Sequence, residues 1–161
     1  MRIFIKTPIG ELDICFDREL RLTKISKKTE FEPSEHIENL PREILRFISS
    51  LNDYFLGNLI EIDFPFELYN LSNFDRVVLD LIKTIPYGKT VSYKWIAEKL
   101  KTSPRAIGQA LKRNPIPIVI PCHRIIKTDG QIGGYSLGIE AKKWLIEHEK
   151  TTLYKLLSHR I

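Results

Sequence analysis

Three prolines within a short apolar run constrain the fold of this chain more than any other feature. Residues 114–126 read NPIPIVIPCHRII, and none of the three prolines has the backbone N–H that a helix or an inner strand needs. Between them, residues 118–120 are apolar enough to be buried. We therefore predict a stiff, buried, extended segment that fixes Cys122 in place at its end.

Cys122 has a base beside it in the sequence. A buried cysteine is usually inert, because apolar surroundings raise the pKa of its thiol. The imidazole of His123 could take up the thiol proton, directly or through a bridging water, because adjacent side chains often point apart. A third group should orient the imidazole, and the candidates are Glu147 and Glu149. On these residues alone, a reactive and an inert Cys122 are equally good interpretations.

The sequence gives no support for a metal site or a membrane span. Cys15 and Cys122 are far apart, and there is neither a CxxC pair nor a His-x3-His pair. No apolar run approaches the roughly 20 residues that cross a bilayer. The first residues alternate like a strand and lack the apolar stretch of a signal peptide. We expect a cytoplasmic protein without metal or membrane partners.

Charge is divided unequally along the chain. Residues 1–70 hold 9 Lys and Arg against 13 Asp and Glu, whereas residues 71–161 hold 16 against 7. Within residues 92–127 there are 8 basic residues and one acidic residue, Glu98. This asymmetry indicates that the C-terminal half binds a polyanion, although a solvated basic surface would look the same.

The change of charge coincides with a change in predicted structure. Residues 1–70 are expected to form a small α/β domain, and residues 71–161 a mostly helical second domain. The predicted elements of the first part are an antiparallel meander over residues 1–25, a loop over 26–35, a helix between Pro41 and Gly57, and a strand over 59–64.

Capping signals divide the second half into helices. They predict a helix capped by Asn73 or Asp75, a helix over 93–100 capped by Ser92, a helix over 105–113 capped by Ser103 with Pro104 at its first position, and a last helix over 138–149. The second and third of these resemble a helix-turn-helix in the most basic segment. Many helix pairs that bind no DNA share this arrangement.

Two residues of the third helix break local rules. Arg105 lies in the first turn, where the helix dipole disfavours a cation. Gly108 lies in the middle, at a cost of about 1 kcal/mol relative to Ala. With Ala106 and Ala110 beside it, this helix is unusually thin. A thin helix can pack closely on another helix, or it can approach a nucleic-acid groove.

The run Pro121-Cys122-His123-Arg124 is the signature of the O6-alkylguanine-DNA alkyltransferases, also called methylated-DNA–protein-cysteine methyltransferases. The chain resembles this family closely over about residues 72–150 and only in outline before residue 70. The other matching segments, in the family's order, are Pro86-Tyr87-Gly88-Lys89-Thr90-Val91-Ser92-Tyr93, Arg105-Ala106-Ile107-Gly108, Asn114-Pro115-Ile116-Pro117, Gly134-Tyr135-Ser136 and Trp144-Leu145-Ile146-Glu147-His148-Glu149.

This resemblance implies an α/β (α+β) fold with an N-terminal ribonuclease-H-like domain and a helical, winged-helix-like domain whose helix-turn-helix enters the minor groove. It also implies catalytic roles. Cys122 resembles the nucleophile, His123 the base acting through water, and Glu149 the group that holds the imidazole. Tyr93 resembles the residue that rotates the phosphate and lies near the flipped base, where it could hydrogen-bond the leaving guanine.

The resemblance also implies binding roles. Arg105 resembles the finger that fills the gap left by the extruded nucleotide. The other expected DNA-binding residues are Ser92, Tyr93, Ala106, Gly108 and Arg124. The expected lining of the guanine pocket is the Ile125 N–H, the Cys122 carbonyl and the loop Gly134-Tyr135-Ser136. Asn114 resembles the hinge between the recognition helix and the cysteine segment.

The implied activity is repair of double-stranded DNA by stoichiometric transfer of an alkyl group from O6-alkylguanine, and also from O4-alkylthymine, to Cys122. The product thioether is stable, so each chain reacts once and needs no cofactor. We expect a monomer, and the sequence does not fix whether copies bind cooperatively along DNA.

Three positions depart from the family pattern. Leu137 stands where many members have glycine, which puts the pocket width and the tolerance of bulky alkyl groups in doubt. Gln109 stands where a small residue is common. Some members bind zinc in the N-terminal domain, but here only Cys15 and His36 are on offer, so we predict no zinc site.

The sequence also bears on three rival functions. A non-reacting lesion sensor of the alkyltransferase-like type typically has tryptophan at the cysteine position, and Cys122 argues against it. A turnover Cys-His hydrolase needs an oxyanion hole and an acyl substrate, and the sequence indicates neither. A purely structural basic protein would leave the cysteine run unexplained.

Overall fold

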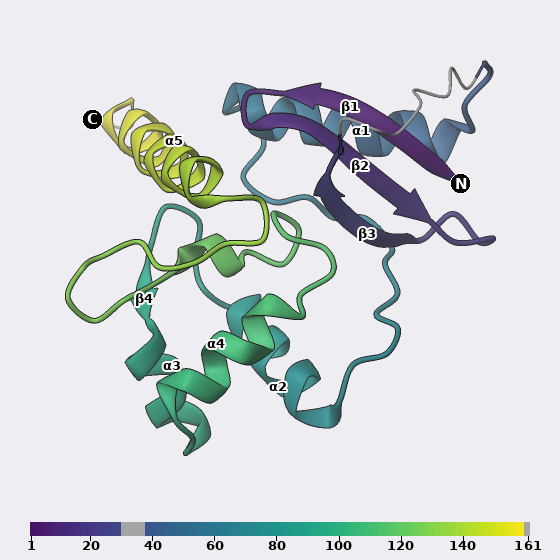
Figure 1. The fold of residues 1–161 in the computed structure, drawn as a ribbon. Coiled ribbons are helices and arrows are strands. Elements are labelled where there is room, and N and C mark those ends of the chain that lie inside the picture. The colour runs from purple at the N-terminus through teal and green to yellow at the C-terminus, as the bar shows by residue number, and fades with distance from the viewer. Residues whose placement is uncertain (30–37, 160–161) are drawn as a thin grey trace.

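The computed structural model describes residues 1–29 and 38–159 and shows the expected mixed α/β fold (Figure 1). Its elements in chain order are β1 (Arg2–Thr7), β2 (Gly10–Phe16), β3 (Leu22–Lys27), α1 (Arg42–Leu56), α2 (Asn73–Ile82), β4 (Val91–Ser92), α3 (Tyr93–Leu100), α4 (Pro104–Lys112), the 3-10 helix η1 (Cys122–Arg124), β5 (Ile125–Ile126) and α5 (Ile139–Ser158). Within these described ranges, no helix is both long and apolar enough to cross a membrane.

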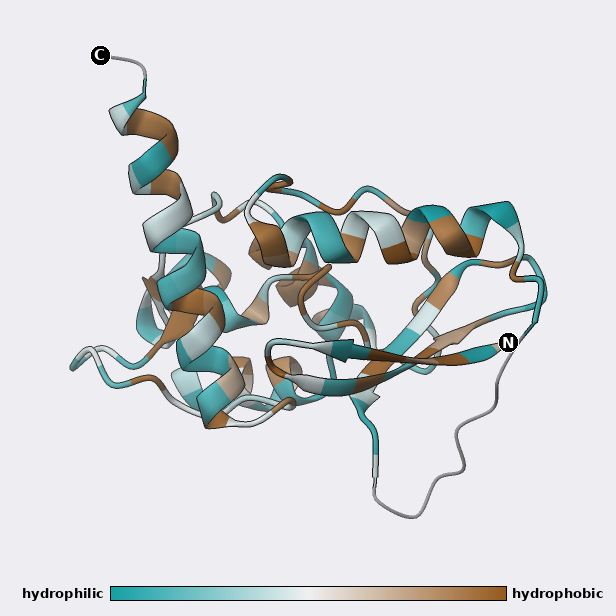
Figure 2. Ribbon diagram, turned by 90° about the horizontal axis from the view of Figure 1, so that it is seen from above, coloured by the Kyte–Doolittle hydropathy of each residue, from teal (hydrophilic) through white to brown (hydrophobic). Residues whose placement is uncertain are grey.

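The predicted meander is confirmed as an antiparallel sheet in the order β1-β2-β3. Helix α1 covers one face of this sheet, and its apolar side faces the strands (Figure 2). The contact includes an edge-to-face pair between Phe16 and Phe47, whose ring centres are 5.4 Å apart. As predicted, α1 ends at Gly57, whose φ of 79° is the left-handed conformation that glycine adopts without strain.

Residues 59–64 do not form the predicted strand. The segment is irregular, and nearby only Phe66 makes an isolated bridge, to Leu22 of β3. Its alternation of apolar residues reflects packing instead, because Phe64 contacts Phe47 with ring centres 5.1 Å apart. The predicted loop over 26–35 is also displaced, since β3 continues to Lys27; residues 30–37 lie outside the described part of the chain.

The helix starts follow side-chain capping. Ser92 accepts a hydrogen bond from the Trp95 N–H at 3.0 Å, and Ser103 caps α4, so both predicted caps are confirmed. The cap of α2 is neither predicted residue: Ser72 occupies that position, and Asp75 completes a capping box with it. Helix α5 continues nine residues beyond its predicted end, because residues 150–158 contain neither glycine nor proline to stop it.

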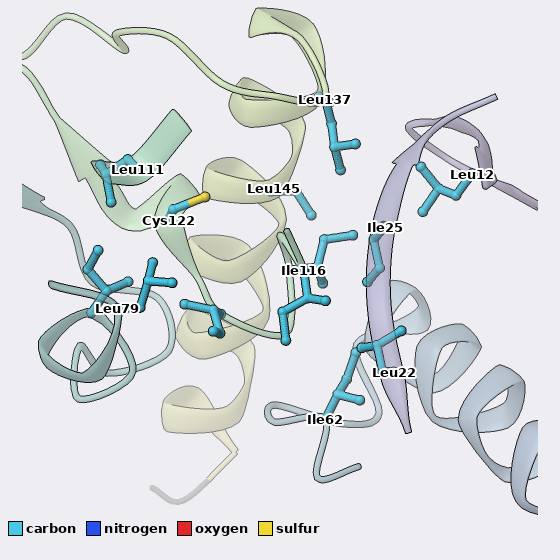
Figure 3. Packing of buried hydrophobic residues seen from close by; sticks show 14 of the residues in the cluster. Leu12, Leu22, Ile25, Ile62, Leu79, Leu111, Ile116, Cys122, Leu137 and Leu145 are labelled. Atoms are coloured by element: carbon cyan, nitrogen blue, oxygen red, sulfur yellow. The ribbon is translucent and has the colours of Figure 1, made fainter. Parts of the chain in front are cut away.

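One apolar core joins the sheet to the helical part. Ile25 of β3 meets Ile116, Leu137 and Leu145 in a single cluster (Figure 3). The Ile25 N–H also donates a hydrogen bond to the Pro115 carbonyl at 2.8 Å. The proline segment is therefore held against the edge of the sheet. The boundary between two domains near residue 70 stays a proposal.

Candidate active site

The proline segment is buried, as predicted, but it is not extended. It turns sharply at Ile118, whose φ is +76°, and Pro117 bridges Ile120 across the turn. A β-branched residue is strained at positive φ, so the surroundings must hold this turn. The side chains of Ile116, Ile118 and Ile120 are all at most 5% exposed, which anchors the turn in the core. The chain then enters η1 at Cys122.

Asn114 ties the end of α4 to the cysteine. Its Nδ2 donates hydrogen bonds to the Ile120 carbonyl at 3.0 Å and to Cys122 Sγ at 3.2 Å. Its Oδ1 accepts from the Ile116 N–H at 3.1 Å. Because Asn114 is itself buried, these bonds hold the end of α4, the turn and the sulfur in one arrangement.

Cys122 lies at the base of a cavity of about 580 Å³ and is 5% exposed. The remaining lining residues are Tyr93, Pro104, Arg105, Gly108, Leu111, Lys112, Lys127, Thr128, Gly133, Gly134, Tyr135 and Ser136. Burial raises the pKa of the thiol to about 11, although the Asn114 amide and the positive charge of Lys142 oppose this. The thiol is therefore protonated at neutral pH until a base removes its proton.

His123 is oriented by Glu149, one of the two predicted candidates. The imidazole Nε2 lies 2.7 Å from Glu149 Oε2, and both side chains are buried. Burial lowers the pKa of His123, with partial opposition from the carboxylate, so the ring is neutral at pH 7. If Nε2 carries the proton shared with Glu149, Nδ1 is unprotonated, and this buried atom has no partner among the described residues. Such a nitrogen can accept a proton.

Glu149 remains ionised despite its burial. Burial raises its pKa, but hydrogen bonds and charges from His123 and Arg124 hold the pKa of Glu149 well below the usual carboxylate range. The Tyr54 hydroxyl of α1 donates a further bond at 2.6 Å, and the Gly88 N–H donates one at 3.3 Å. The carboxylate thus fixes η1 to helix α1 and to the loop before β4.

The prediction that Arg124 contacts DNA does not fit its position. Its side chain is enclosed, and its Nε and Nη2 donate to Glu149 at 2.8 and 3.0 Å. Its Nη1 donates to the Ile85 carbonyl at 2.7 Å. Arg124 therefore serves as the counter-ion of Glu149, since a carboxylate buried this deeply needs a cation beside it.

One wall of the cavity is a close contact between Tyr93 and the loop of Gly133. A Cβ at Gly133 would lie 3.0 Å from the Tyr93 hydroxyl, and φ at this glycine is +78°. The short distance and the positive φ exclude a residue larger than glycine at position 133 unless the loop rearranges. Burial raises the pKa of Tyr93, so its hydroxyl keeps its proton and can donate a hydrogen bond into the cavity.

The thin helix forms the rim of the same cavity. Arg105 is exposed there and has no hydrogen-bond or ion-pair partner among the residues that the structure describes. Gly108 also lines the cavity, and a Cβ added to it would meet only Tyr93 Cε1, at 4.0 Å. Close packing against another helix therefore does not account for Gly108. Ala106 is half-buried beside them.

The other predicted pocket residues lie in different places. Gly134, Tyr135 and Ser136 line the cavity. Ile125 is fully buried, and its N–H donates to the Cys122 carbonyl, so these two predicted pocket groups are paired with each other. Ser92 caps α3 and pairs with β5, outside the cavity lining.

Leu137 does not narrow the pocket. Its side chain is fully buried in the core and points away from Cys122 toward Leu12 and Ile25 of the sheet (Figure 3). Leucine at this position anchors the pocket loop to the sheet. Leu137 therefore does not reduce the width of the pocket, contrary to the concern that the sequence raised.

Sequence reasoning missed two residues of the site. Tyr54 lies within the helix predicted between Pro41 and Gly57, where nothing in the sequence indicates a role in the site, yet its hydroxyl reaches Glu149. The second is Lys142, which is fully buried and whose Nζ donates to the Gly134 carbonyl at 3.1 Å. Its spacing of seven residues from Glu149 on a predicted helix would have placed both on one face.

The described residues contain no group of three side chains suited to hold a metal ion. Cys15 is a free, partly exposed thiol of β2. His36, the other residue considered for zinc, lies outside the described residues.

Comparison with known proteins identifies a consistent set of relatives. Residues 73–151 match the family model described as the DNA-binding domain of 6-O-methylguanine DNA methyltransferase. A methylated-DNA–protein-cysteine methyltransferase of Methanocaldococcus vulcanius is 45% identical over 120 residues, which cover 74% of this chain and 71% of the relative. One from Sulfolobus acidocaldarius is 46% identical over 106 residues, which cover 66% of this chain and 67% of the relative.

Solved structures agree over nearly the whole chain. The Mycobacterium tuberculosis OGT in complex with DNA superposes with a TM-score of 0.80 at 35% identity, covering 94% of this chain and 93% of that one. An O6-methylguanine DNA methyltransferase from Methanococcus jannaschii gives a TM-score of 0.68 at 32% identity, covering 92% of this chain and 93% of that one.

Proposed function

The chain belongs to the 6-O-methylguanine DNA methyltransferase family, and from this premise we propose that it repairs double-stranded DNA by moving the alkyl group of O6-alkylguanine to its own Cys122. One observation carries the proposal. Cys122 lines a cavity and accepts a hydrogen bond from Asn114. The next residue, His123, is buried, and its imidazole is held by Glu149. This arrangement suits a nucleophile with its base.

The reaction is a displacement at the alkyl carbon. The Cys122 thiol gives its proton, through a water, to Nδ1 of His123, and the resulting thiolate attacks the alkyl carbon. A C–S bond forms, the C–O6 bond breaks, and its electron pair passes to the guanine. The guanine accepts a hydrogen bond from the Tyr93 hydroxyl as it leaves and takes up a proton. Overall, the thiol proton replaces the alkyl group on the base.

The lesion reaches Cys122 only if its nucleotide leaves the helix. O6 of guanine faces the major groove within the base stack, beyond the reach of a buried thiol. Arg105 at the cavity rim fills the vacated space, and Tyr93 turns the flanking phosphate. The thin face of Ala106 and Gly108 lets α4 approach the minor groove.

Each chain reacts once. The thioether formed on Cys122 is stable, so the alkyl group stays on the sulfur. O4-alkylthymine presents the same alkyl–oxygen bond and is a second substrate. The protein acts as a monomer on DNA.

The test follows removal of the lesion from a duplex that carries O6-methylguanine. The wild-type chain should convert the lesion to guanine in an amount that does not exceed the amount of protein. Cys122→Ala should bind the duplex and leave the lesion unchanged, whereas the matched variant Cys15→Ala should react like the wild type. Lesion removal by Cys122→Ala would assign the nucleophile to another residue.

A further inference from the structure

Helix α5 presents two buried charges of opposite sign to η1. Lys142 and Glu149 are seven residues apart, so they share one face of the helix about 10 Å apart along its axis. Lys142 is 0% exposed and Glu149 is 1% exposed. The role of Glu149 follows from its bonds to His123 and Arg124, but the proposed reaction assigns no role to Lys142.

Lys142 has no carboxylate partner among the described residues. Its Nζ donates to the Gly134 carbonyl at 3.1 Å and lies 5.6 Å from the centre of the Tyr93 ring. Burial lowers the pKa of Lys142 to about 8, and the attraction of Cys122 acts against this. An ammonium ion buried without a counter-ion is costly, so a partner that becomes negative only transiently would account for its position.

The groups that face Lys142 identify this partner. The titratable side chains that interact with Lys142 or with Cys122 are Cys122 itself and His123 of η1, Tyr93 of α3 and Tyr135 of the pocket loop. Burial raises the pKa of both tyrosines, so they keep their protons, and Glu149 on the same helix is occupied by His123 and Arg124. Among them, only Cys122 becomes an anion in the proposed reaction.

We propose that Lys142 is the positioning residue that stabilises the Cys122 thiolate with its positive charge while tying the pocket loop of Gly134 to α5. The inference rests on the proposed function in one respect, that the thiolate is the reacting form. When the proton moves from Cys122 to His123, two charges appear in a buried site. The imidazolium meets Glu149 and the thiolate meets Lys142, so α5 stabilises both products of the proton transfer.

A neutral alkylating reagent tests this without DNA. The rate at which iodoacetamide modifies Cys122 measures the thiolate population, because the thiolate displaces iodide and the thiol does not. All variants carry Cys15→Ser, so that Cys122 is the single cysteine. Lys142→Gln keeps a donor for the Gly134 carbonyl without the charge, Lys142→Arg keeps the charge, and Lys143→Gln is the control on the exposed side of α5.

Loss of the positive charge of Lys142 and loss of its contact with the Gly134 loop should have different effects on the rate of iodoacetamide modification. At pH 7, we expect Lys142→Gln to react about tenfold more slowly, equivalent to about one pKa unit, and Lys142→Arg and Lys143→Gln to stay within about threefold of the parent. Above pH 9 the parent and Lys142→Gln should converge, because Lys142 has lost its proton there. Equal slowing by Gln and Arg at every pH would show a loop contact alone and overturn the proposal, as would an unchanged rate in Lys142→Gln.

The comparison of the parent with Lys142→Arg stands even if the Gln variant does not fold. The increase of log rate with pH should flatten near pH 8 in the parent and stay straight in Lys142→Arg, whose charge persists. Straight lines in both would overturn the proposal. Because no DNA is present, these results are independent of the lesion-removal assay, whose failure would concern the proposed function alone.

Discussion

At the scale of single residues, the reactivity of Cys122 depends on side chains that compensate for its burial. Its thiol pKa of about 11 leaves little thiolate at pH 7. In the proposed reaction, the neutral imidazole of His123 is the acceptor of the thiol proton, and Glu149 stabilises the imidazolium that forms. We therefore expect the cysteine to be inert in the resting protein and to become nucleophilic when its proton moves within the site.

The pH dependence of transfer should follow His123. Because burial lowers the pKa of His123, the imidazole stays neutral to a pH below the ordinary value of about 6.5. Transfer from free O6-methylguanine base, which needs no DNA binding, should therefore keep its rate at pH 6.5 and fall only at lower pH. A fall centred at or above pH 6.5 would contradict the neutral-base assignment. His123→Ala, which lacks the base, should lose at least about 100-fold in rate.

Glu149→Gln should destabilise the fold. The substitution leaves the buried Arg124 without its counter-ion, which typically costs about 3–5 kcal/mol in the free energy of unfolding. The pKa of Glu149 is lower in the folded than in the unfolded chain, so its stabilisation is complete above the unfolded value of about 4.3 and is lost as the pH falls toward the folded value.

Denaturant unfolding at pH 7 and pH 3 measures both effects. The loss of stability between these pH values should be smaller in Glu149→Gln than in the wild type. Glu147→Gln, on the exposed side of the same helix, is the matched control and should change stability by less than about 0.5 kcal/mol. Equal effects of the two variants would argue against the assignment of Glu149.

At the scale of elements, α4 connects Arg105 at the cavity with Asn114 and, through it, with Cys122. Its first turn carries Arg105 and its end carries Asn114, which bonds to the Cys122 sulfur. The end of α4 is also attached to α2, because Arg113 donates to the buried Asp75 with both Nε and Nη2. If α4 contacts DNA as proposed, we expect a displacement of this helix to reach the sulfur through Asn114.

Arg105→Ala should affect duplex DNA and free base differently. If Arg105 fills the space of the extruded nucleotide, its loss raises the cost of extrusion, and we expect transfer from duplex DNA to slow about tenfold, equivalent to about 1.4 kcal/mol. Transfer from free O6-methylguanine should be unchanged, since no base is extruded. Single-turnover rates with both substrates provide the comparison, and equal losses would exclude the finger role.

The elements that could be predicted are those with local causes. Ser92 and Ser103 were identified because a capping hydroxyl acts on its own helix. The turn at Ile118 could not be, because β-branched residues avoid positive φ and only tertiary packing holds one there. Residues 59–64 alternate like a strand, yet they pack against α1 and the sheet without pairing.

The residues of the site likewise fall into those that the sequence indicated and those that depend on tertiary packing. The residues themselves indicated Cys122 and His123 and left Glu147 and Glu149 as alternatives, the family resemblance favoured Glu149, and the structure brings His123 and Glu149 together. The positions of Arg124 and Lys142 were not foreseen, because Arg and Lys are almost always exposed unless they are paired. Which cations are buried depends on how α5 packs against η1, and this packing is not local in sequence.

At the scale of the whole molecule, the structure shows which basic residues of the C-terminal half are exposed on the surface. Of the basic residues between 92 and 127, Arg124 is buried with Glu149, and Arg113 is paired with Asp75. The exposed remainder comprises Lys94, Lys99, Lys101, Arg105, Lys112 and Lys127. Arg105, Lys112 and Lys127 line the cavity of Cys122, so positive charge lies where the proposed function places the lesion.

Binding to DNA should be strongly salt dependent. If the exposed cations neutralise two or more phosphates, the affinity of Cys122→Ala for duplex DNA should fall about sevenfold or more for a threefold rise in salt. Lys112→Gln should reduce the slope of log affinity against log salt by about one. Lys155→Gln, near the exposed end of α5, should leave it unchanged. A flat response in the parent would contradict binding by this basic surface.

The most direct test of the central claim is the mass of the intact protein after incubation with an excess of duplex DNA containing O6-methylguanine. We predict a gain of one methyl group per chain and no more, with the methyl group on the peptide that contains Cys122. An unchanged mass while the lesion disappears would indicate turnover instead of transfer, and a methyl group on any other residue would contradict the assignment of Cys122.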